Sequence, residues 1–307
     1  MKYHIGIDAG ASKSKLVMTN DSLKKIIETK GGAANILKQG KEKSAETICN
    51  LILKSLKIAK ITNPEIECIT VGAAGAGRKS DANEFQNILS EKLEEKNINF
   101  SNLFIISDAE AALEGAFNGG PGCILISGTG SIAYGKDPNG IIIRVGGFGR
   151  NIGDEGSGFS IGSKGINEFS KQIDGRHPKT ILFDIFSLKL KISSSEDLIN
   201  LVYSSNYDLS SAAPLVIESA EKKDRLCLQI LNDEVDELLS HIRTVKSRIA
   251  APSMKLCLSG SILNTNNYFS KIFRQKIKLL NPEIVIIEPA FPPEIGAIVY
   301  GLKSKPL

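Results

Sequence analysis

The 307-residue sequence lacks several features that would assign it to a special class of protein. No apolar run is long enough to span a bilayer, and the start, MKYHIGIDAG, lacks the apolar core of a signal peptide. No basic block of the kind that follows nucleic acid is present, and the formal net charge is only +4. We therefore expect a cytoplasmic protein that binds neither membranes nor nucleic acid.

Cysteine and histidine are scarce and scattered. The five cysteines lie far apart in apolar stretches, at Cys49, Cys68, Cys123, Cys227 and Cys257. An odd, dispersed set predicts reduced structural thiols and argues against disulfides or a zinc site. The three histidines are isolated too, without the spacing of metal ligands.

The composition, 42% hydrophobic and 23% charged, is that of a globular enzyme, and the length suggests two domains. The order strand–strand–strand–helix–strand–helix–strand occurs twice, with a helix-rich stretch at about 157–250 added to the second copy. We therefore predict an α/β fold with lobes formed by residues 1–117 plus 291–307 and by residues 118–290. Two such lobes would face each other across a cleft, where ligands usually bind.

Two hairpins share a composition that suits phosphate: IGIDAGASKSKLV (5–17) and ILISGTGSIAYG (124–135). Glycine lets the backbone approach a ligand, and successive N–H groups form an anion site. A single loop of this kind would be read as a mobile turn, but two equivalent loops in a duplicated pattern favour phosphate binding. The predicted phosphate-binding residues are Gly10, Ala11, Ser12, Lys13, Gly128, Thr129, Gly130 and Ser131.

Two aspartates end strands beside these loops. Asp8 could hold Mg²⁺ through its water shell, although an Asp bonded to its own turn is the common alternative. Asp108 ends a buried strand and precedes a helix, so it is the best candidate for a general base, with helix N-capping as the alternative.

Three motifs together resemble the BadF/BadG/BcrA/BcrD-type ATPases, and most closely the N-acetylglucosamine kinases among them. They are the first hairpin, the ISGTGS loop, and GGFGRNIGDEGSG (146–158), and the similarity covers nearly the whole chain. The resemblance implies two ribonuclease H-like lobes of the actin/hexokinase type, with a nucleotide cleft between them and a helical insertion in the second lobe. It also implies an ATP- and Mg²⁺-dependent kinase that phosphorylates the 6-hydroxyl of N-acetylglucosamine.

The resemblance also assigns site residues. It implies sugar contacts from Asn35, Asp108, Phe148 and Asp154, with Asp108 at the hydroxyl that is phosphorylated. Phe148 stands where similar kinases often have Trp, so the resemblance does not define the pocket for the acyl group. Gly260 and Ser261 in LSGSILNTN resemble the family's adenosine loop, although serine replaces a second glycine.

Alternatives remain within and outside this activity. Glucosamine or N-acetylmuramic acid could be the substrate. The wider family also contains ATPase activators of reductases and dehydratases, whose cysteines hold an iron–sulfur cluster, but the dispersed cysteines here disfavour that activity. A sugar-sensing regulator ranks last, because no recognition helix is visible. Analogy suggests a homodimer formed through the helical insertion.

Overall fold

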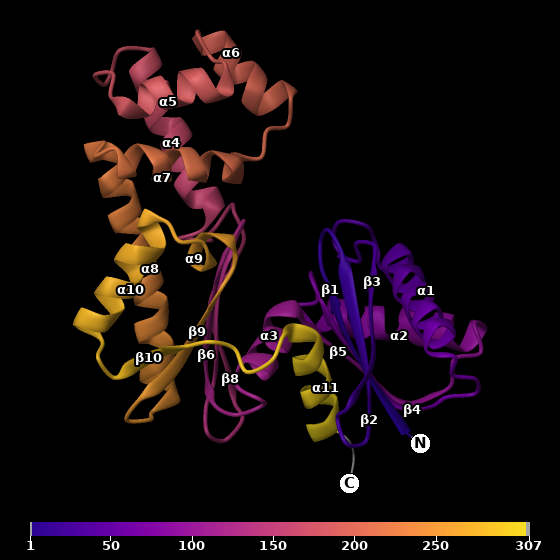
Figure 1. The fold of residues 1–307 in the computed structure, drawn as a ribbon. Coiled ribbons are helices and arrows are strands. Elements are labelled where there is room, and N and C mark those ends of the chain that lie inside the picture. The colour runs from indigo at the N-terminus through magenta and orange to yellow at the C-terminus, as the bar shows by residue number, and fades with distance from the viewer. Residues whose placement is uncertain (1, 305–307) are drawn as a thin grey trace. The chain divides into compact units, whose positions relative to one another are not determined.

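The computed structural model describes residues 2–304 and divides them into two compact units (Figure 1). Unit 1 consists of the described residues up to Pro121 together with those from Glu288 onward, and unit 2 is Gly122–Ile287. Unit 1 is therefore discontinuous in sequence, because the last helix of the chain returns to it.

Unit 1 is built on a five-stranded sheet in the order β3-β2-β1-β4-β5. Its strands are β1 (Lys2–Ala9), β2 (Ser14–Asn20), β3 (Lys25–Gly31), β4 (Glu65–Ala73) and β5 (Phe100–Ser107). The first three form an antiparallel meander, whereas β1, β4 and β5 run parallel. The carboxyl ends of these three strands consequently lie at one edge of the sheet.

Four helices complete unit 1. They are α1 (Lys41–Ala59), α2 (Lys79–Glu95), α3 (Asp108–Ala116) and α11 (Pro293–Lys303). Helix α11 packs tightly on α3, since a Cβ atom on Gly296 would lie only 2.0 Å from the carbonyl oxygen of Ala111. The chain enters α11 through backbone bonds from Ala290 and Phe291 to the end of α3. These contacts fix α11 against α3.

Unit 2 repeats the sheet of unit 1. Its strands are β6 (Gly122–Ser127), β7 (Ser131–Lys136), β8 (Ile142–Gly146), β9 (Met254–Ser259) and β10 (Ile284–Ile287), in the order β10-β9-β6-β7-β8. Both sheets therefore have a three-stranded antiparallel meander followed by two parallel strands on the other side of the first strand. This equivalence confirms the duplicated element order predicted from the sequence.

Helices occupy most of the chain between β8 and β9 and the segment after β9. They are α4 (Gly158–Ile173), α5 (Ile181–Leu190), α6 (Ser195–Ile199), the π-helical turn η1 (Asn200–Ser204), the 3₁₀ turn η2 (Leu209–Ala212), α7 (Ala213–Glu221), α8 (Arg225–Ile249), α9 (Ser261–Asn264) and α10 (Tyr268–Leu280). Helix α8 packs a long buried stripe against the rest of unit 2, including Leu231, Val235, Leu238 and Ile242. Apolar burial of this kind is the main source of stability for the unit.

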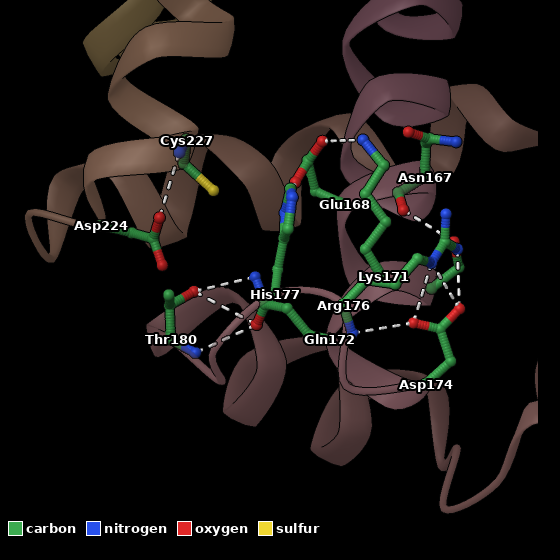
Figure 2. A network of polar contacts seen from close by, with 11 residues as sticks. Asn167, Glu168, Lys171, Gln172, Asp174, Arg176, His177, Thr180, Asp224 and Cys227 are labelled. Carbon is green, nitrogen blue, oxygen red and sulfur yellow. Dashed lines mark hydrogen bonds and ion pairs between the residues drawn. The ribbon is translucent and has the colours of Figure 1, made fainter.

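Polar side chains join these helices at their ends (Figure 2). The buried Asp224 caps α8 by accepting from the N–H of Cys227 at 3.1 Å. It also accepts from the N–H of Leu182, the second residue of α5, at 2.8 Å. In the last turn of α4, Gln172 accepts from the N–H of Thr180 at 3.0 Å. These bonds join the end of α4 to the start of α5, and the start of α5 to the start of α8.

Asp81 with Glu84 three positions later is a capping-box-like pattern, which predicts a helix start at Asp81. In the structure α2 begins at Lys79, and no side chain caps it. The carboxylate of Asp81 instead pairs with Lys41 at 2.9 Å and with Arg78 at 2.6 Å. Two nearby cations therefore take the acceptor that capping would have used.

Within residues 2–304, no helix is both long and apolar enough to cross a membrane.

Candidate functional site

The first predicted phosphate loop closes the hairpin between β1 and β2. The N–H of Gly10 donates to the carbonyl oxygen of Lys13 at 3.1 Å, and the N–H of Ala34 donates to the carbonyl oxygen of Gly10 at 3.0 Å. Residues 11–13 are exposed. The loop is thus anchored at its base, and its tip is open to a ligand.

Asp108 is the first residue of α3, and another residue performs the capping. Ser107 is the N-cap, because its Oγ accepts from the N–H of Glu110 at 3.1 Å. The carboxylate of Asp108 accepts from the N–H of the next residue, Ala109, at 2.9 Å. Its surface is open to solvent, yet the protein packed around the carboxyl group raises its pKa. Both properties suit a general base, which must be reachable and poised to take a proton.

Asp8 lies at the same sheet edge as Asp108. It is the next-to-last residue of β1, opposite Gly72 of β4, and the strand beyond, β5, runs directly into Asp108. The pKa of Asp8 is raised to about 6, mainly by burial and then by the negative charges of Asp108 and Glu294, against Lys15 and Lys13, which lower it. Unit 1 therefore concentrates carboxylates beside its predicted phosphate loop.

Glu294 belongs to this cluster and was not predicted from the sequence. It is 2% exposed in the first turn of α11, and its carboxylate pairs with Lys15 Nζ at 2.5 Å. A signal was available, because a Glu directly after the Pro292–Pro293 pair in an otherwise apolar helix has to be accommodated by a partner. The partner, on β2, cannot be identified from sequence spacing.

Asn35 lies between the first phosphate loop and the end of β4. Its neighbours on either side bond to those elements, Ala34 to Gly10 and Ile36 to the carbonyl oxygen of Ala74. The Oδ1 atom of Asn35 accepts from the N–H groups of Leu37 and Lys38, both at 3.0 Å. The side chain is thereby oriented, with its amide nitrogen as the group that can donate to a ligand.

In unit 2, three separated segments converge around the second phosphate loop. The carbonyl oxygens of Gly128 and Thr129 accept from the first two N–H groups of α4. A Cβ atom on Gly130 would lie 2.9 Å from Asp154 Oδ2, and one on Gly128 would lie 3.8 Å from Ser261 Oγ. The predicted phosphate loop (128–131), the predicted sugar loop (146–158) and the predicted adenosine loop at Gly260 and Ser261 thus meet within one unit.

Serines of the second hairpin hold the sugar loop. Ser127 Oγ donates to the carbonyl oxygen of Gly156 at 2.6 Å, and Ser131 Oγ donates to that of Glu155 at 2.5 Å. The hydroxyl of Ser131 is therefore committed inside the protein, and its predicted contact with phosphate stays a prediction.

Asp154 has an uncommon backbone conformation, with φ of 63°. Its Oδ1 accepts from the N–H of Gly149 at 3.3 Å, so the side chain folds back across the loop. Ser157, not Asp154, caps α4. Burial raises the pKa of the Asp154 carboxyl, while the backbone N–H groups of Gly149 and Ser131 lower it. Asp is among the residues that adopt the left-handed region most readily, and the surrounding loop holds it there.

Phe148 projects from the same loop and is 67% exposed. The guanidinium of Arg144 lies 5.8 Å from the centroid of its ring. An exposed aromatic ring supported by a cation on one side is available to pack against a ligand on the other.

The predicted adenosine loop depends on one glycine. Gly260 has φ of 94°, and a Cβ atom there would lie 2.2 Å from the carbonyl oxygen of Ser127. Ser261 then begins the short helix α9. The close approach binds the ends of β6 and β9 together beside the phosphate loop.

Glu234 of α8 is a second residue that the sequence analysis missed. It is fully buried, and its carboxylate accepts from the N–H of Gly156, from Ser160 Oγ at 2.6 Å and from Lys164 Nζ at 2.6 Å. The signal was a carboxylate on the apolar stripe of a long helix, between Leu231 and Val235.

Lys164 also lines a pocket of about 530 Å³ whose walls include Glu168 and His177 and none of the predicted site residues.

Comparison with known proteins agrees with this organisation. Residues 5–301 match the model of the BadF/BadG/BcrA/BcrD ATPase family. The chain is 34% identical over 307 residues to the N-acetylmuramic acid/N-acetylglucosamine kinase of Clostridium acetobutylicum, covering 98% of each protein. It is 28% identical over 316 residues to the N-acetyl-D-glucosamine kinase of Dictyostelium discoideum, again covering 98% of each.

A solved structure from Chromobacterium violaceum, provisionally named an N-acetylglucosamine kinase, superposes with a TM-score of 0.77 at 21% identity. The alignment covers 97% of this chain and 98% of that one. This likeness, with the two equivalent five-stranded sheets, confirms the predicted α/β fold with two lobes of the same sheet order. Because the family model spans almost the entire sequence, the chain belongs to the BadF/BadG/BcrA/BcrD ATPase family.

Proposed function

We propose that this protein is an ATP-dependent amino-sugar kinase that converts N-acetylglucosamine to N-acetylglucosamine 6-phosphate. The observation that carries the proposal is the pair formed by Asp8 and Asp108, which lie at the carboxyl ends of the parallel strands β1 and β5, on either side of β4, at one sheet edge beside the first glycine loop. Phosphoryl transfer depends on positioning, charge neutralisation and a base for the attacking alcohol. Relatives of similar length that are named kinases of N-acetylated amino sugars support the same substrate class.

Asp108 would act as the base. The 6-oxygen of the sugar forms a bond to the γ-phosphorus, the bond from that phosphorus to the bridging oxygen of ADP breaks, and the hydroxyl proton passes to the carboxylate of Asp108. The raised pKa of Asp108 brings its proton affinity closer to neutral pH, which favours this transfer. Asn35 and Asp154 would bind sugar hydroxyls, and the two glycine loops would bind the phosphates of ATP.

The residues around Asp8 fit a bound Mg²⁺ ion. Carboxylates whose mutual repulsion and burial raise the pKa of Asp8 leave negative charge that a divalent cation would compensate. Among residues 2–304, no group of three or more side chains converges as a complete metal-binding set. That arrangement suits Mg²⁺, which keeps several waters and usually takes one or two carboxylates together with substrate phosphates. The ion would neutralise charge on the transferred phosphoryl group.

The experiment is a coupled ADP-release assay with ATP, Mg²⁺ and a panel of sugars. N-acetylglucosamine should give the highest kcat/KM, with glucosamine and N-acetylmuramic acid as the competing substrates. Turnover on none of the amino sugars would refute the proposal. The five buried cysteines lie on five different elements, which gives no support to the alternative of a cluster-bearing activator.

A further inference from the structure

A buried carboxylate that is distant in sequence from the predicted sugar-binding residues is hydrogen-bonded to the sugar loop. Glu234 is 0% exposed on the apolar face of α8. Removing a carboxylate from water is costly unless several donors satisfy it. Its three donors are Gly156, Ser160 and Lys164, spaced four residues apart, so they lie along one side of α4 and the turn leading into it.

The decisive contact involves a single peptide group. The carbonyl oxygen of Glu155 and the N–H of Gly156 belong to the same peptide plane. Ser131 Oγ donates to that carbonyl oxygen at 2.5 Å, and Glu234 Oε2 accepts from that N–H. The plane is therefore held at both ends, by the phosphate hairpin on one side and by α8 on the other.

This peptide plane begins one residue after Asp154, in a stretch with left-handed backbone. Asp154 has φ of 63° and Gly156 has φ of 75°. A Cβ atom on Gly156 would lie 2.2 Å from Leu238 Cγ, so the loop also packs closely on α8. Glycine adopts such a conformation freely, whereas a residue with a side chain, such as Asp154, depends on its surroundings to hold it.

We infer that Glu234 is a positioning residue that fixes the Glu155–Gly156 peptide and thereby directs the carboxylate of Asp154 toward the sugar. The inference rests on the proposed function for the identity of the ligand. Glu234 does not touch the substrate in this account. Its effect passes through the backbone, so it belongs to sugar affinity and not to the proton transfer at Asp108.

The Glu234→Leu variant tests the inference. Leucine fits the surrounding apolar stripe, and buried ion pairs can often be replaced by apolar residues without loss of stability. Lys164 is not left buried, because its side chain is 48% exposed. We expect the KM for the sugar to rise about tenfold or more, with the KM for ATP little changed, since a hydrogen bond to a charged group is lost.

The Glu234→Gln variant retains one acceptor oxygen for the Gly156 N–H and should recover most of the sugar affinity. Glu237→Gln changes an exposed charge on the same helix and should leave both KM values unchanged. If Glu234→Leu does not fold, Glu234→Asp replaces it. The side chains of Ser160 and Lys164 can move to keep their bonds to the shorter carboxylate. The backbone N–H of Gly156 cannot move in this way and loses its acceptor, so the sugar KM should again rise.

Amide hydrogen exchange gives a readout that needs no substrate. Exchange across residues 154–158 should accelerate in Glu234→Leu and remain near wild type in Glu234→Gln. Unchanged exchange and unchanged sugar KM in the Leu variant would overturn the inference. A fall in melting temperature and kcat with both KM values unchanged would also overturn it, since that pattern marks a structural role alone. Absence of sugar turnover in the wild type would refute the proposed function, while the exchange result would still decide the role of Glu234.

Discussion

The carboxylates of Asp8 and Asp108 lie within electrostatic reach of each other at one edge of the first sheet. The pKa of Asp8 is raised to about 6, with burial as the largest cause and the charge of Asp108 as the next. The protein therefore places two aspartates where their ionised forms repel, next to a loop suited to phosphate. Such clusters are costly to stability and are typical of functional sites.

Replacing Asp8 by Asn should stabilise the fold and weaken activity. The pKa of this acid is higher in the folded than in the unfolded protein, so its contribution to stability falls as pH rises from about 4 to about 6 and stays low above that range. At pH 7 the Asn variant should gain up to about 3 kcal/mol in unfolding free energy. Denaturant unfolding at pH 4 and pH 7 measures the difference.

The gain should be small at pH 4, where the aspartate is protonated in the folded protein. The same variant should need a higher Mg²⁺ concentration for half-maximal turnover. An equal stability change at both pH values would contradict the electrostatic account of Asp8.

Replacing Asp108 by Asn should remove most turnover and leave the fold and ATP binding intact. A positioned general base contributes roughly 10²–10⁴ in rate. Steady-state kcat measures the loss, and nucleotide titration measures retained binding. Glu110→Gln changes a charge two residues further along α3 and serves as the matched control, with near-normal kcat. Near-normal kcat in Asp108→Asn would remove Asp108 from the base position.

Phe148→Ala should change substrate preference without changing stability, because the ring is 67% exposed. If the ring packs against the acetyl group, its loss should raise the KM for N-acetylglucosamine several-fold, at about 0.8 kcal/mol for each buried methyl-sized group. The KM for glucosamine, which lacks the acetyl group, should change less. Ile152→Ala, at a neighbouring residue that is 78% exposed, provides the control. An equal rise in KM for both sugars would mean that the ring of Phe148 does not pack against the acetyl group.

Gly130→Ala should raise the KM for the sugar. The added methyl group would lie 2.9 Å from Asp154 Oδ2, so the carboxylate must move. Gly77→Ala, whose Cβ would meet nothing within 4 Å, should leave both KM values as they are. Sugar titration by calorimetry checks the effect, and wild-type affinity in Gly130→Ala would mean that Asp154 does not bind the sugar in this position.

The sequence predicted what local patterns determine. Period-two and period-3.6 hydrophobicity identified the two equivalent sets of elements, and the glycine-rich hairpins identified both loops that the structure places at strand ends. Capping was harder to predict, because Ser107 and Ser157, not the neighbouring aspartates, cap α3 and α4. Several polar residues could suit each helix start, and the surrounding loop decides among them.

Contacts between distant residues were beyond prediction from one sequence. Glu234 lies 78 residues from Gly156, and Glu294 pairs with a lysine on β2. Each appears in the sequence as an unpaired charge in an apolar helix, and only the fold supplies its partners. The left-handed backbone of Asp154 is equally a product of the surrounding loop, since nothing local demands it.

The central claim is that the protein transfers the γ-phosphoryl group of ATP to the 6-hydroxyl of an amino sugar. The most direct measurement is phosphorus NMR of the product formed from ATP and N-acetylglucosamine, with 6-deoxy-N-acetylglucosamine as the comparison. The account predicts one phosphate ester per ADP, coupled to the protons on carbon 6, and no ester from the deoxy sugar. An ester on another oxygen, or ADP released without any ester, would contradict it.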